Sequence, residues 1–403
     1  MIWTIKKAIY RAMHGSLKVM MVLFNLPEPE LFTGAGSSLK IPEVVKSKGI
    51  NNVLVVTDKV LMELNLLEGL FNSLKENNVE YKVFDDVSEN PTIQNVEDGL
   101  KLYLEGKCAG IIAFGGGSPM DCAKAIGARA VNPKRSVLVM KGLFKVRRKI
   151  PPLFTIPTTA GTGSETTIAA VIKDPDTHEK FAIVDMKLIP IVAALDPELM
   201  VGLPPHITSS TGMDALTHAV EAYIGVCGNK LTNENAEKAT KLIFENLEEV
   251  YKDGLNLEKR NNMALASYYA GVAFTRAGVG YVHAIAHNMG GLYGVPHGLA
   301  NAVILPYILE FSRKDAEEKL AGLAIAGGIG TPIESNEELS YRFIEKVKAM
   351  NKNMGIPSSI KEIQIKDIPL IAERAVKEGN PDYPVPKIMN QKECEGIIRK
   401  LLP

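Results

Sequence analysis

The stretch AGIIAFGGGSPMDCAKAIG, residues 109–127, decides the fold. A short apolar run leads into three glycines, 115–117, and then into a helical pattern. Glycines let the backbone approach a ligand closely, and the free amides and positive dipole of a helix start suit a phosphate group. We expect Ser118 at the N-cap, Pro119 at N1, where its missing N–H is harmless, and Asp121 at N3 as the acidic member of a capping box. The pattern predicts a strand–turn–helix unit that binds phosphates, although three glycines alone also fit a tight turn without a ligand.

On both sides of this stretch, apolar runs alternate with helical patterns, which predicts a parallel sheet covered by helices. Beyond about residue 203 the pattern becomes helical and no convincing strand follows. We therefore expect an α/β domain followed by an all-helical domain, with the boundary near residue 200. The expected strands are residues 52–58, 79–85, 109–114, 136–140, 152–157, 166–174, 180–185 and 190–196.

Length and composition narrow the class of protein. The chain has 403 residues, 46% hydrophobic and 23% charged, as expected of about two globular domains. Lys plus Arg and Asp plus Glu balance at 46 each, so nothing indicates nucleic acid or another polyanion as partner. The four cysteines are scattered, which favours reduced thiols and a cytoplasmic protein. No apolar run has the length of a membrane span, so no integral membrane contact is expected.

Residues 1–27, which begin MIWTIKKAIYRAMHGSLKVMMVLF, are basic and partly amphipathic. The apolar run is short for a signal peptide, and no small-residue cleavage site follows it. We interpret this segment as an N-terminal extension that packs on the body of the protein or on a neighbouring subunit. A weak contact with a membrane surface is the alternative.

Four of the seven histidines fall in two windows, STGMDALTHAVEAY (210–223) and YVHAIAHNMGGLYGVPHGLANAVILP (281–306). Asp214 and His218 share a helix face, as do His283 and His287, because each pair is four residues apart. With His297, one carboxylate and three imidazoles could hold a divalent metal that polarises the oxygen of an alcohol or carbonyl. One D-x-x-x-H pair is often chance, but three histidines within fifteen residues are harder to dismiss. One of His283 and His287 would remain for proton transfer.

Two further features fit a dinucleotide. Asp58 ends an early apolar run, where its carboxylate could accept hydrogen bonds from a ribose and would repel a 2′-phosphate, favouring NAD over NADP. It could also be a simple turn residue. The loop PTTAGTGSETT, residues 157–167, is dense in hydroxyls and amides for a mere linker.

Taken together, FGGGSPMDCAK, IPTTAGTGSE, STGMDALTHA, the H-x3-H-x9-H spacing ending in VPHGLANA, and ERAVKEGNPDYPVPK resemble the iron-containing (group III) alcohol dehydrogenases. The resemblance runs from about Glu28 to the end of the chain. It implies a dehydroquinate synthase-like fold, with a Rossmann-like NAD-binding domain over residues 28–203 and a helical metal-binding domain over residues 204–403. It also implies a homodimer or larger even oligomer.

The same resemblance implies roles for individual residues. The metal ligands would be Asp214, His218, His283 and His297, and His287 would be the residue for proton transfer. Fe(II) is the metal that the family implies, and Zn(II) is the alternative because it binds such sites more tightly. The implied cofactor contacts are Asp58, Asn90, Gly116, Gly117, Ser118, Thr158, Thr159, Thr167 and Lys180.

The expected reaction is reversible hydride transfer between a small alcohol or diol and NAD, with the metal acting on the substrate oxygen. One alternative is a lyase or cyclase of the dehydroquinate synthase type that recycles its NAD. Such an enzyme handles a phosphorylated substrate, yet Arg276 is one of few basic residues near the metal motifs. A second alternative is a non-catalytic protein that senses NAD or metal. Short-chain alcohols, diols, lactaldehyde and hydroxy acids all remain open as substrates.

Overall fold

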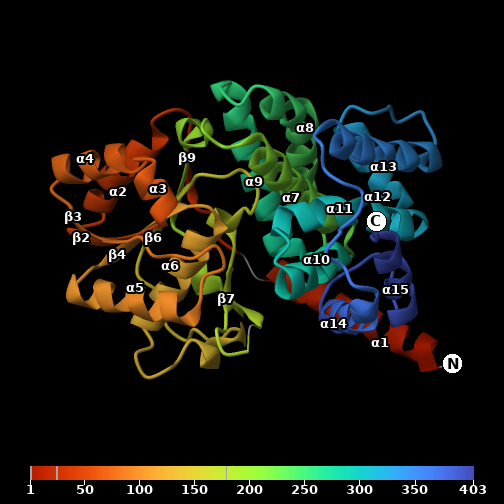
Figure 1. The fold of residues 1–403 in the computed structure, drawn as a ribbon, viewed down its shortest axis with the longest axis horizontal. Helices are drawn as coiled ribbons and strands as arrows, with labels where there is room; N and C mark the ends of the chain where they lie inside the picture. Colours follow the sequence, from red (N-terminus) through yellow and green to blue (C-terminus); the bar gives the residue numbers. More distant parts are fainter. Residues whose placement is uncertain (1, 24–25, 178) are drawn as a thin grey trace. The chain divides into compact units, whose positions relative to one another are not determined.

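The structure is a computed structural model that describes residues 2–23, 26–177 and 179–403. The chain divides into two compact units, each described separately below (Figure 1). The α/β unit comprises Pro27–Gly202 and Leu255–Ala264. The helical unit comprises Met1–Leu26, Leu203–Gly254 and Leu265–Pro403. This arrangement of a parallel-sheet unit and a helical unit confirms the predicted fold class.

The α/β unit is built on a parallel sheet with the strand order β1-β9-β6-β4-β2-β3. Its central strands are apolar except for Asn52 and Thr155, because helices cover both faces. Successive side chains of a strand point to opposite faces, so Leu54 and Ile111 enter one core while Val55 and Ile112 enter the other. The strands are β1 (Glu30–Thr33), β2 (Asn52–Val56), β3 (Glu80–Phe84), β4 (Gly110–Gly115), β6 (Leu153–Pro157) and β9 (Val192–Leu195).

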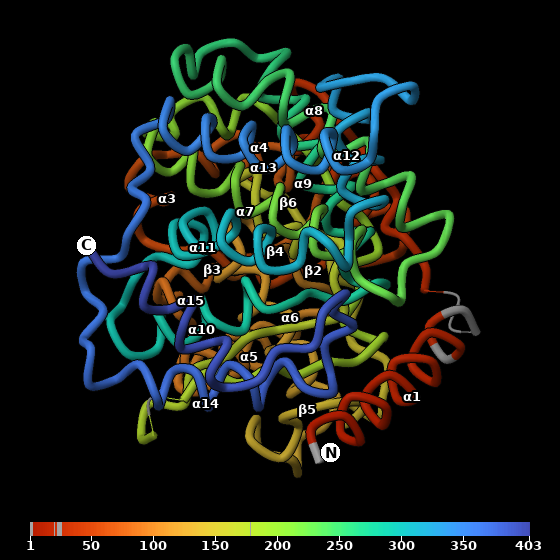
Figure 2. Tube along the Cα trace, turned by 90° about the vertical axis from the view of Figure 1, so that its right-hand side faces the viewer, coloured from red at the N-terminus to blue at the C-terminus, as the bar shows by residue number. Residues whose placement is uncertain are grey.

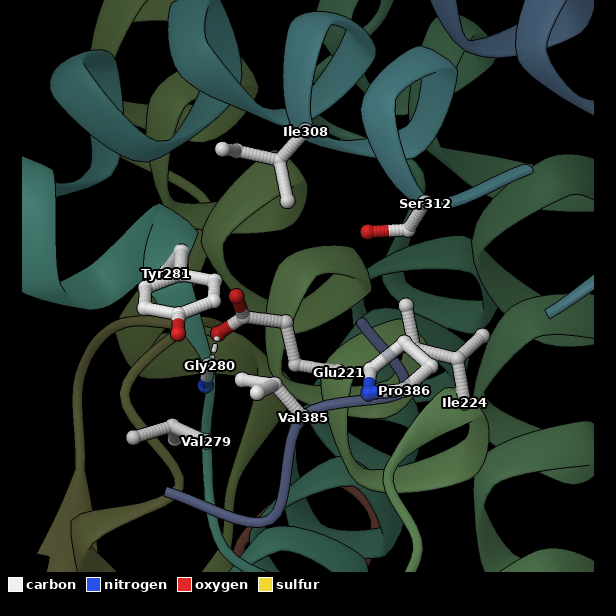
Figure 3. A pocket seen from close by; sticks show the side chains of 9 residues that line it. All are labelled: Glu221, Ile224, Val279, Gly280, Tyr281, Ile308, Ser312, Val385 and Pro386. Atoms are coloured by element: carbon white, nitrogen blue, oxygen red, sulfur yellow. Dashed lines mark hydrogen bonds between the residues drawn. The ribbon is translucent and has the colours of Figure 1, made fainter. Parts of the chain in front are cut away.

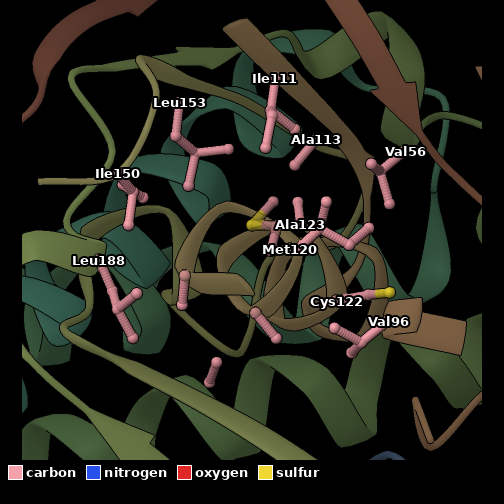
Figure 4. Packing of buried hydrophobic residues seen from close by; sticks show 14 of the residues in the cluster. Val56, Val96, Ile111, Ala113, Met120, Cys122, Ala123, Ile150, Leu153 and Leu188 are labelled. Carbon is pink, nitrogen blue, oxygen red and sulfur yellow. The ribbon is translucent and has the colours of Figure 1, made fainter. Parts of the chain in front are cut away.

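Helices α5 (Ile93–Glu105) and α6 (Gly117–Ala130) supply the first core, where Figure 4 shows Met120 and Ala123 beneath Ile111 and Ala113. Helices α2 (Ile41–Ser47) and α4 (Glu68–Glu76) supply the second. The remaining helix of this half is the short α3 (Lys59–Glu63). The sheet is thus held between two apolar layers, which fixes the loops at the ends of its strands.

The strand predictions were confirmed with one exception. Residues 136–140 do not form a strand, because Leu138–Met140 is a 3₁₀ helix. Val137 and Met140 are buried while the two residues between them are exposed, a helical rather than an alternating pattern. Strand β1 and the two-residue β5 (Gly142–Leu143) were not predicted from the sequence. All strands were expected in the parallel sheet, whereas β7 (Ala169–Lys173) and β8 (Lys180–Val184) pair antiparallel in a separate small sheet with β5.

The helical unit is centred on α7 (Pro205–Ile224), which is buried over most of its surface and packs on α8 (Lys230–Lys252) and α11 (His297–Ser312). Helix α10 (Tyr281–Tyr293) packs on α11 and on α14 (Ile368–Gly379). The other helices are α1 (Ile2–Leu23), α12 (Glu317–Ala326), α13 (Asn336–Asn353) and α15 (Gln391–Lys400). Helix α9 (Leu257–Ala277) belongs to the helical unit from Leu265 onward, and its first turns, up to Ala264, belong to the α/β unit. Across the described residues, none of the helices combines the length and hydropathy that a bilayer crossing needs.

Helix α11 contains a proline in its interior, Pro306. Proline has no N–H, so the carbonyl of Ala302 lacks the helical hydrogen bond it would otherwise accept. The side chain of Asn351 replaces that bond, since its Nδ2 donates to the Ala302 oxygen at 2.7 Å. The proline is therefore accommodated by a residue of α13.

Candidate metal and nucleotide sites

Two helices and the start of a third carry the predicted metal ligands. Asp214 lies in α7, His283 in α10, and His297 is the first residue of α11. One ligand atom from each of these three residues lies within 4.8 Å of the other two. Asp214 and His283 are buried, whereas His297 is partly exposed. The three groups therefore converge from different elements on one point that solvent can reach.

The amide of Asn301 lies at this point. Its Nδ2 donates to Asp214 Oδ1 at 2.6 Å and is 3.3 Å from His283 Nε2 and 3.1 Å from His297 Nε2. An amide has two N–H donors, so it cannot satisfy three acceptors at once. Its Oδ1 is buried and has no hydrogen-bond partner within the described part of the chain. Three converging lone pairs of carboxylate and imidazole beside an unsatisfied oxygen are a donor set that fits a divalent cation.

His218 lies next to this group rather than within it. Its ring stacks on Phe274 with 4.1 Å between centroids and on His283 with 4.6 Å. It is buried, one turn of α7 after Asp214. Of the four predicted ligands, the structure thus brings Asp214, His283 and His297 within ligand distance of one another and places His218 against the ring of His283.

A glycine explains why α11 can begin so close to α7. A Cβ at Gly298 would lie 2.5 Å from the carbonyl oxygen of Ser210, which no side chain could tolerate. The absence of that Cβ lets the first turn of α11 rest on the backbone of α7, one turn before Asp214. The residue after His297 is therefore small for a packing reason.

The orientation of His283 is set by Glu221. Glu221 Oε2 lies 2.6 Å from His283 Nδ1, and the carboxylate also accepts the N–H groups of Gly280 and Val282, each at 2.8 Å. Figure 3 shows the Glu221 carboxylate turned towards Gly280. Burial raises the pKa of Glu221 to about 7, and burial lowers the pKa of His283 well below its usual value. A neutral His283 that donates from Nδ1 presents the lone pair of Nε2 towards Asp214 and His297.

His287 has a carboxylate partner of its own. Its Nδ1 lies 2.6 Å from Glu378 Oε1, and the Tyr383 hydroxyl donates to the same oxygen at 2.7 Å. The His287 ring stacks on that of His297 with 5.4 Å between centroids. Burial, followed by the charge of Glu378, raises the pKa of Tyr383 well above its ordinary value. Tyrosine, carboxylate and imidazole therefore form a hydrogen-bonded chain that ends beside the metal candidate.

In the α/β unit, the predicted nucleotide contacts gather at one edge of the sheet. Asp58 follows β2, Gly116 follows β4 and Thr158 follows β6, and these three strands are parallel neighbours. The carboxyl ends of parallel strands lie at the same edge, where open α/β sheets bind ligands. The turn after β4 needs glycine, because Gly115 has φ +144° and a Cβ there would lie 2.6 Å from the ring of Pro119.

The start of α6 differs from the sequence prediction. Gly116, not Ser118, is the N-cap, and the helix begins at Gly117 without a side-chain cap. The Ser118 hydroxyl donates instead to the carbonyl of Glu89. Asp121 accepts from Ser164 Oγ at 2.9 Å and from the Val171 N–H at 3.0 Å. The predicted capping box is therefore wrong, because both side chains bond to residues outside α6 and leave its first amides without a side-chain cap. Pro119 lies at N3 and not at the predicted N1.

The remaining predicted contacts take varied positions. Asp58 caps α3 by accepting from the Leu61 N–H at 3.0 Å. Asn90 lies in the exposed bend before α5, and Lys180 starts β8 with a pKa that burial lowers. Thr159 follows Thr158 in the loop after β6.

The hydroxyl of Thr167 belongs to a buried polar network. Lys124 Nζ donates to Thr167 Oγ1 at 2.6 Å, and further to Ser164 Oγ and to the carbonyls of Ser164 and Ala169. Lys124 is fully buried, so this network ties the 157–167 loop to α6.

Five further polar residues of these sites were not predicted from the sequence: Glu221, Asn301, Glu378, Tyr383 and Lys124. Two of them stood within the quoted metal windows, Glu221 three residues after His218 and Asn301 four residues after His297. That helical spacing was the available signal.

Two family models together span nearly the whole chain. "Iron-containing alcohol dehydrogenase" matches residues 28–197, and "Fe-containing alcohol dehydrogenase family, C-terminal" matches residues 208–402. The 1,3-propanediol dehydrogenase of Citrobacter freundii is 39% identical over 373 residues, covering 92% of this chain and 96% of its own. The lactaldehyde reductase of Escherichia coli strain K12 is 36% identical over 355 residues, covering 86% and 92% respectively.

Solved structures give the same result. A 1,3-propanediol oxidoreductase superposes with a TM-score of 0.90 at 37% identity, covering 94% of this chain and 100% of its own. A sulfoacetaldehyde reductase from Bifidobacterium kashiwanohense in complex with NAD⁺ superposes with a TM-score of 0.84 at 26% identity, covering 94% and 98%. From the metal motifs, the fold and these matches together, the chain belongs to the iron-containing alcohol dehydrogenase family.

Proposed function

We propose that this oxidoreductase transfers a hydride reversibly between a small alcohol or diol and NAD, with a metal held by Asp214, His218, His283 and His297. The observation that carries the proposal is the convergence of lone pairs from Asp214, His283 and His297 within 4.8 Å. The relatives at this level of similarity are named as dehydrogenases or reductases of small alcohols and aldehydes, which supports the substrate class.

A divalent metal bound there supplies Lewis acidity towards a substrate oxygen. Asp214 contributes the negative charge that a cation requires, and Glu221 keeps Nε2 of His283 unprotonated by holding the proton on Nδ1. His218, whose ring lies on that of His283, completes the set of one carboxylate and three imidazoles. Fe(II) is the metal we propose, and Zn(II) is the alternative that this donor set also suits.

The nicotinamide ring supplies the hydride acceptor or donor. For its dinucleotide we propose the glycine turn at Gly116 and Gly117, together with the other contacts predicted at the sheet edge. Asp58 favours NAD over NADP, because a carboxylate accepts hydrogen bonds from a ribose and repels a 2′-phosphate. The NAD⁺ complex of the sulfoacetaldehyde reductase supports this preference.

We propose His287 as the residue that takes up the alcohol proton and returns it in the reverse reaction. Glu378 fixes its ring through Nδ1, which directs the other nitrogen, Nε2, to proton transfer. The Tyr383 hydroxyl donates to the same oxygen of Glu378 and so helps to hold the carboxylate in place. A cytoplasmic location and an even-numbered homo-oligomer stay predictions of the sequence, as does the division at residues 27 and 203.

The proposal is tested with protein of defined metal content. Fe(II)-loaded, Zn(II)-loaded and chelator-stripped samples are assayed with NADH and NADPH against a panel of small aldehydes, diols and hydroxy acids. We expect NADH oxidation that requires metal. His283→Ala and His297→Ala should each lose bound metal and turnover, whereas His206→Ala, an exposed histidine at the start of α7, should lose neither. Full activity in metal-free protein would refute the proposal.

A further inference from the structure

Helix α1 lies outside the region that matches the family, which begins at residue 28. Residues 1–27 carry four cations and no acidic residue. The whole chain has 46 residues of each sign, so the remainder has an acidic excess of four. Residues 1–27 therefore carry a net charge of four positive units against a net negative remainder, and the activity proposed above does not explain it.

One face of α1 is hydrogen-bonded to the rest of the helical unit. Arg11 donates from Nη1 to the Val385 carbonyl at 2.6 Å, and it also donates to that of Pro386. His14 Nε2 lies 2.8 Å from the Pro381 carbonyl, and His14 is buried. The inward face repeats every three or four residues, as a packed helix requires, through Trp3, Lys7, Tyr10, His14, Leu17 and Met21. Helix α1 is therefore a docked element of the unit.

The opposite face of α1 is apolar although it is exposed. Ile5, Ile9, Met13 and Val19 have exposed fractions of 55, 53, 47 and 62%. Ala8, Ala12 and Ser16 lie among them at helical spacing and are exposed as well. We call these seven residues the outer stripe. Because these residues are exposed, the outer stripe faces away from the rest of the helical unit, at whose margin α1 lies in Figure 2.

Two lysines border the outer stripe. Lys6 and Lys18 are both exposed and lie on the two flanks of the helix, between the outer stripe and the inward face. Lysine can lay its methylene chain along an apolar surface while its ammonium group reaches the water or a phosphate. An apolar stripe bordered by cations, without any acidic residue, is the pattern of a helix that lies in a lipid interface.

We infer that α1 docks this enzyme on an anionic membrane surface, with the helix axis parallel to the surface and the outer stripe among the acyl chains. Whatever covers the outer stripe must be apolar where it meets the stripe and negatively charged where it meets the lysines. An anionic bilayer meets both conditions. A second copy of α1 meets only the first, because the segment carries four cations and no acidic residue, so two copies repel each other. A single helix of this kind binds reversibly.

The experiment uses the full chain and vesicles of phosphatidylcholine, with or without phosphatidylglycerol, at low and high salt. We expect co-sedimentation with the anionic vesicles that salt weakens, and little with neutral ones. The double variant Lys6→Gln/Lys18→Gln should bind about fivefold more weakly for each lysine removed. The double variant Ile5→Ser/Ile9→Ser should lose at least about tenfold, because two apolar side chains no longer enter the lipid.

Matched controls replace the same residue types elsewhere. Ile333→Ser and Lys361→Gln alter exposed positions far along the chain and should bind vesicles like the unaltered protein. All variants should keep the melting temperature and the aldehyde reduction rate of the unaltered enzyme, which separates this inference from the proposed function. Equal binding to neutral vesicles, or none to anionic ones, would overturn it. A concentration-dependent mass in light scattering that Ile5→Ser/Ile9→Ser abolishes would overturn it too, by identifying a second copy as the occupant.

Discussion

Glu221 of α7 accepts three hydrogen bonds at once, from the backbone of Gly280 and Val282 and from the ring of His283, and so joins α7 to the first turn of α10. The carboxylate fixes where α10 begins and which nitrogen of His283 carries the proton. Burial raises the pKa of Glu221, and three donors offset that cost. One side chain thus couples the position of a metal ligand to its protonation.

Glu221→Gln tests that coupling. Glutamine keeps the shape but presents a weaker acceptor, so we expect metal affinity to fall about 10- to 100-fold. Competition of the protein with a chromogenic chelator measures this directly, without relying on turnover. Glu237→Gln is the matched control, because Glu237 bonds to Tyr223 and not to a histidine. Unchanged affinity in Glu221→Gln would mean that His283 is held by its packing alone.

His287 should affect the rate without affecting the metal. We expect His287→Asn to lower kcat about 100-fold, the usual contribution of a positioned general base, while bound metal stays at the level of the unaltered protein. Metal analysis and steady-state kinetics on the same sample give both numbers. Tyr383→Phe, which removes the hydroxyl that supports Glu378, should shift the pH profile of kcat with a smaller loss. If His287→Asn also loses its metal, His287 is a ligand and the proposed assignment is wrong.

Asp58 is expected to set the preference between the two nicotinamide cofactors. Asp58→Ser removes the charge, and serine can still cap α3 by accepting from the Leu61 N–H. We therefore expect kcat/KM with NADPH to rise relative to NADH while thermal stability changes little. Asp98→Ser, at an exposed position of α5, serves as the control. A cofactor ratio equal to that of the unaltered enzyme would show that Asp58 only caps the helix.

Glu165 should make stability depend on pH. Burial raises its pKa to about 7 from an ordinary 4.5, so the folded state holds a proton that the unfolded state has released between these values. The contribution of this group to stability is therefore complete below the lower pKa and declines as the pH rises to about 7.

Glu165→Gln removes that decline, because glutamine is neutral at every pH. The melting temperature of the variant should exceed that of the unaltered protein increasingly from pH 5 to pH 8, with an upper bound of about 3 kcal/mol on the relative gain. Thermal melts in matched buffers measure it. A difference that stays constant with pH would place Glu165 in its charged form throughout, paired with Lys124.

Local pattern was enough to predict most of the sheet. The runs that became β2, β4 and β6 are apolar apart from Asn52 and Thr155, and a strand buried on both faces leaves that signature in a sequence. The run at residues 136–140 has the same composition, but its burial follows a helical period that composition does not reveal. Strands as short as β1 and β5 contain too few residues to show a period.

The candidate metal site was likewise predictable from the sequence only in part. The D-x-x-x-H and H-x-x-x-H spacings and the resemblance supplied its residues, because helical spacing is a local property. The positions of Asn301 and Glu378 relative to the histidines depend on how α10, α11 and α14 pack. That packing cannot be inferred from a local sequence pattern. The same holds for Asp121, whose partner Ser164 is 43 residues away.

The hydrogen bond from Asn351 to the Ala302 carbonyl, which Pro306 leaves without its helical donor, has a practical consequence for protein engineering. Pro306 and Asn351 depend on each other although they lie in different helices. A chimera whose crossover falls between them takes the proline from one parent and the residue at position 351 from the other. Junctions placed before residue 302 or after residue 351 keep the pair together, and shuffled libraries built on this scaffold should recover functional clones mainly with those junctions.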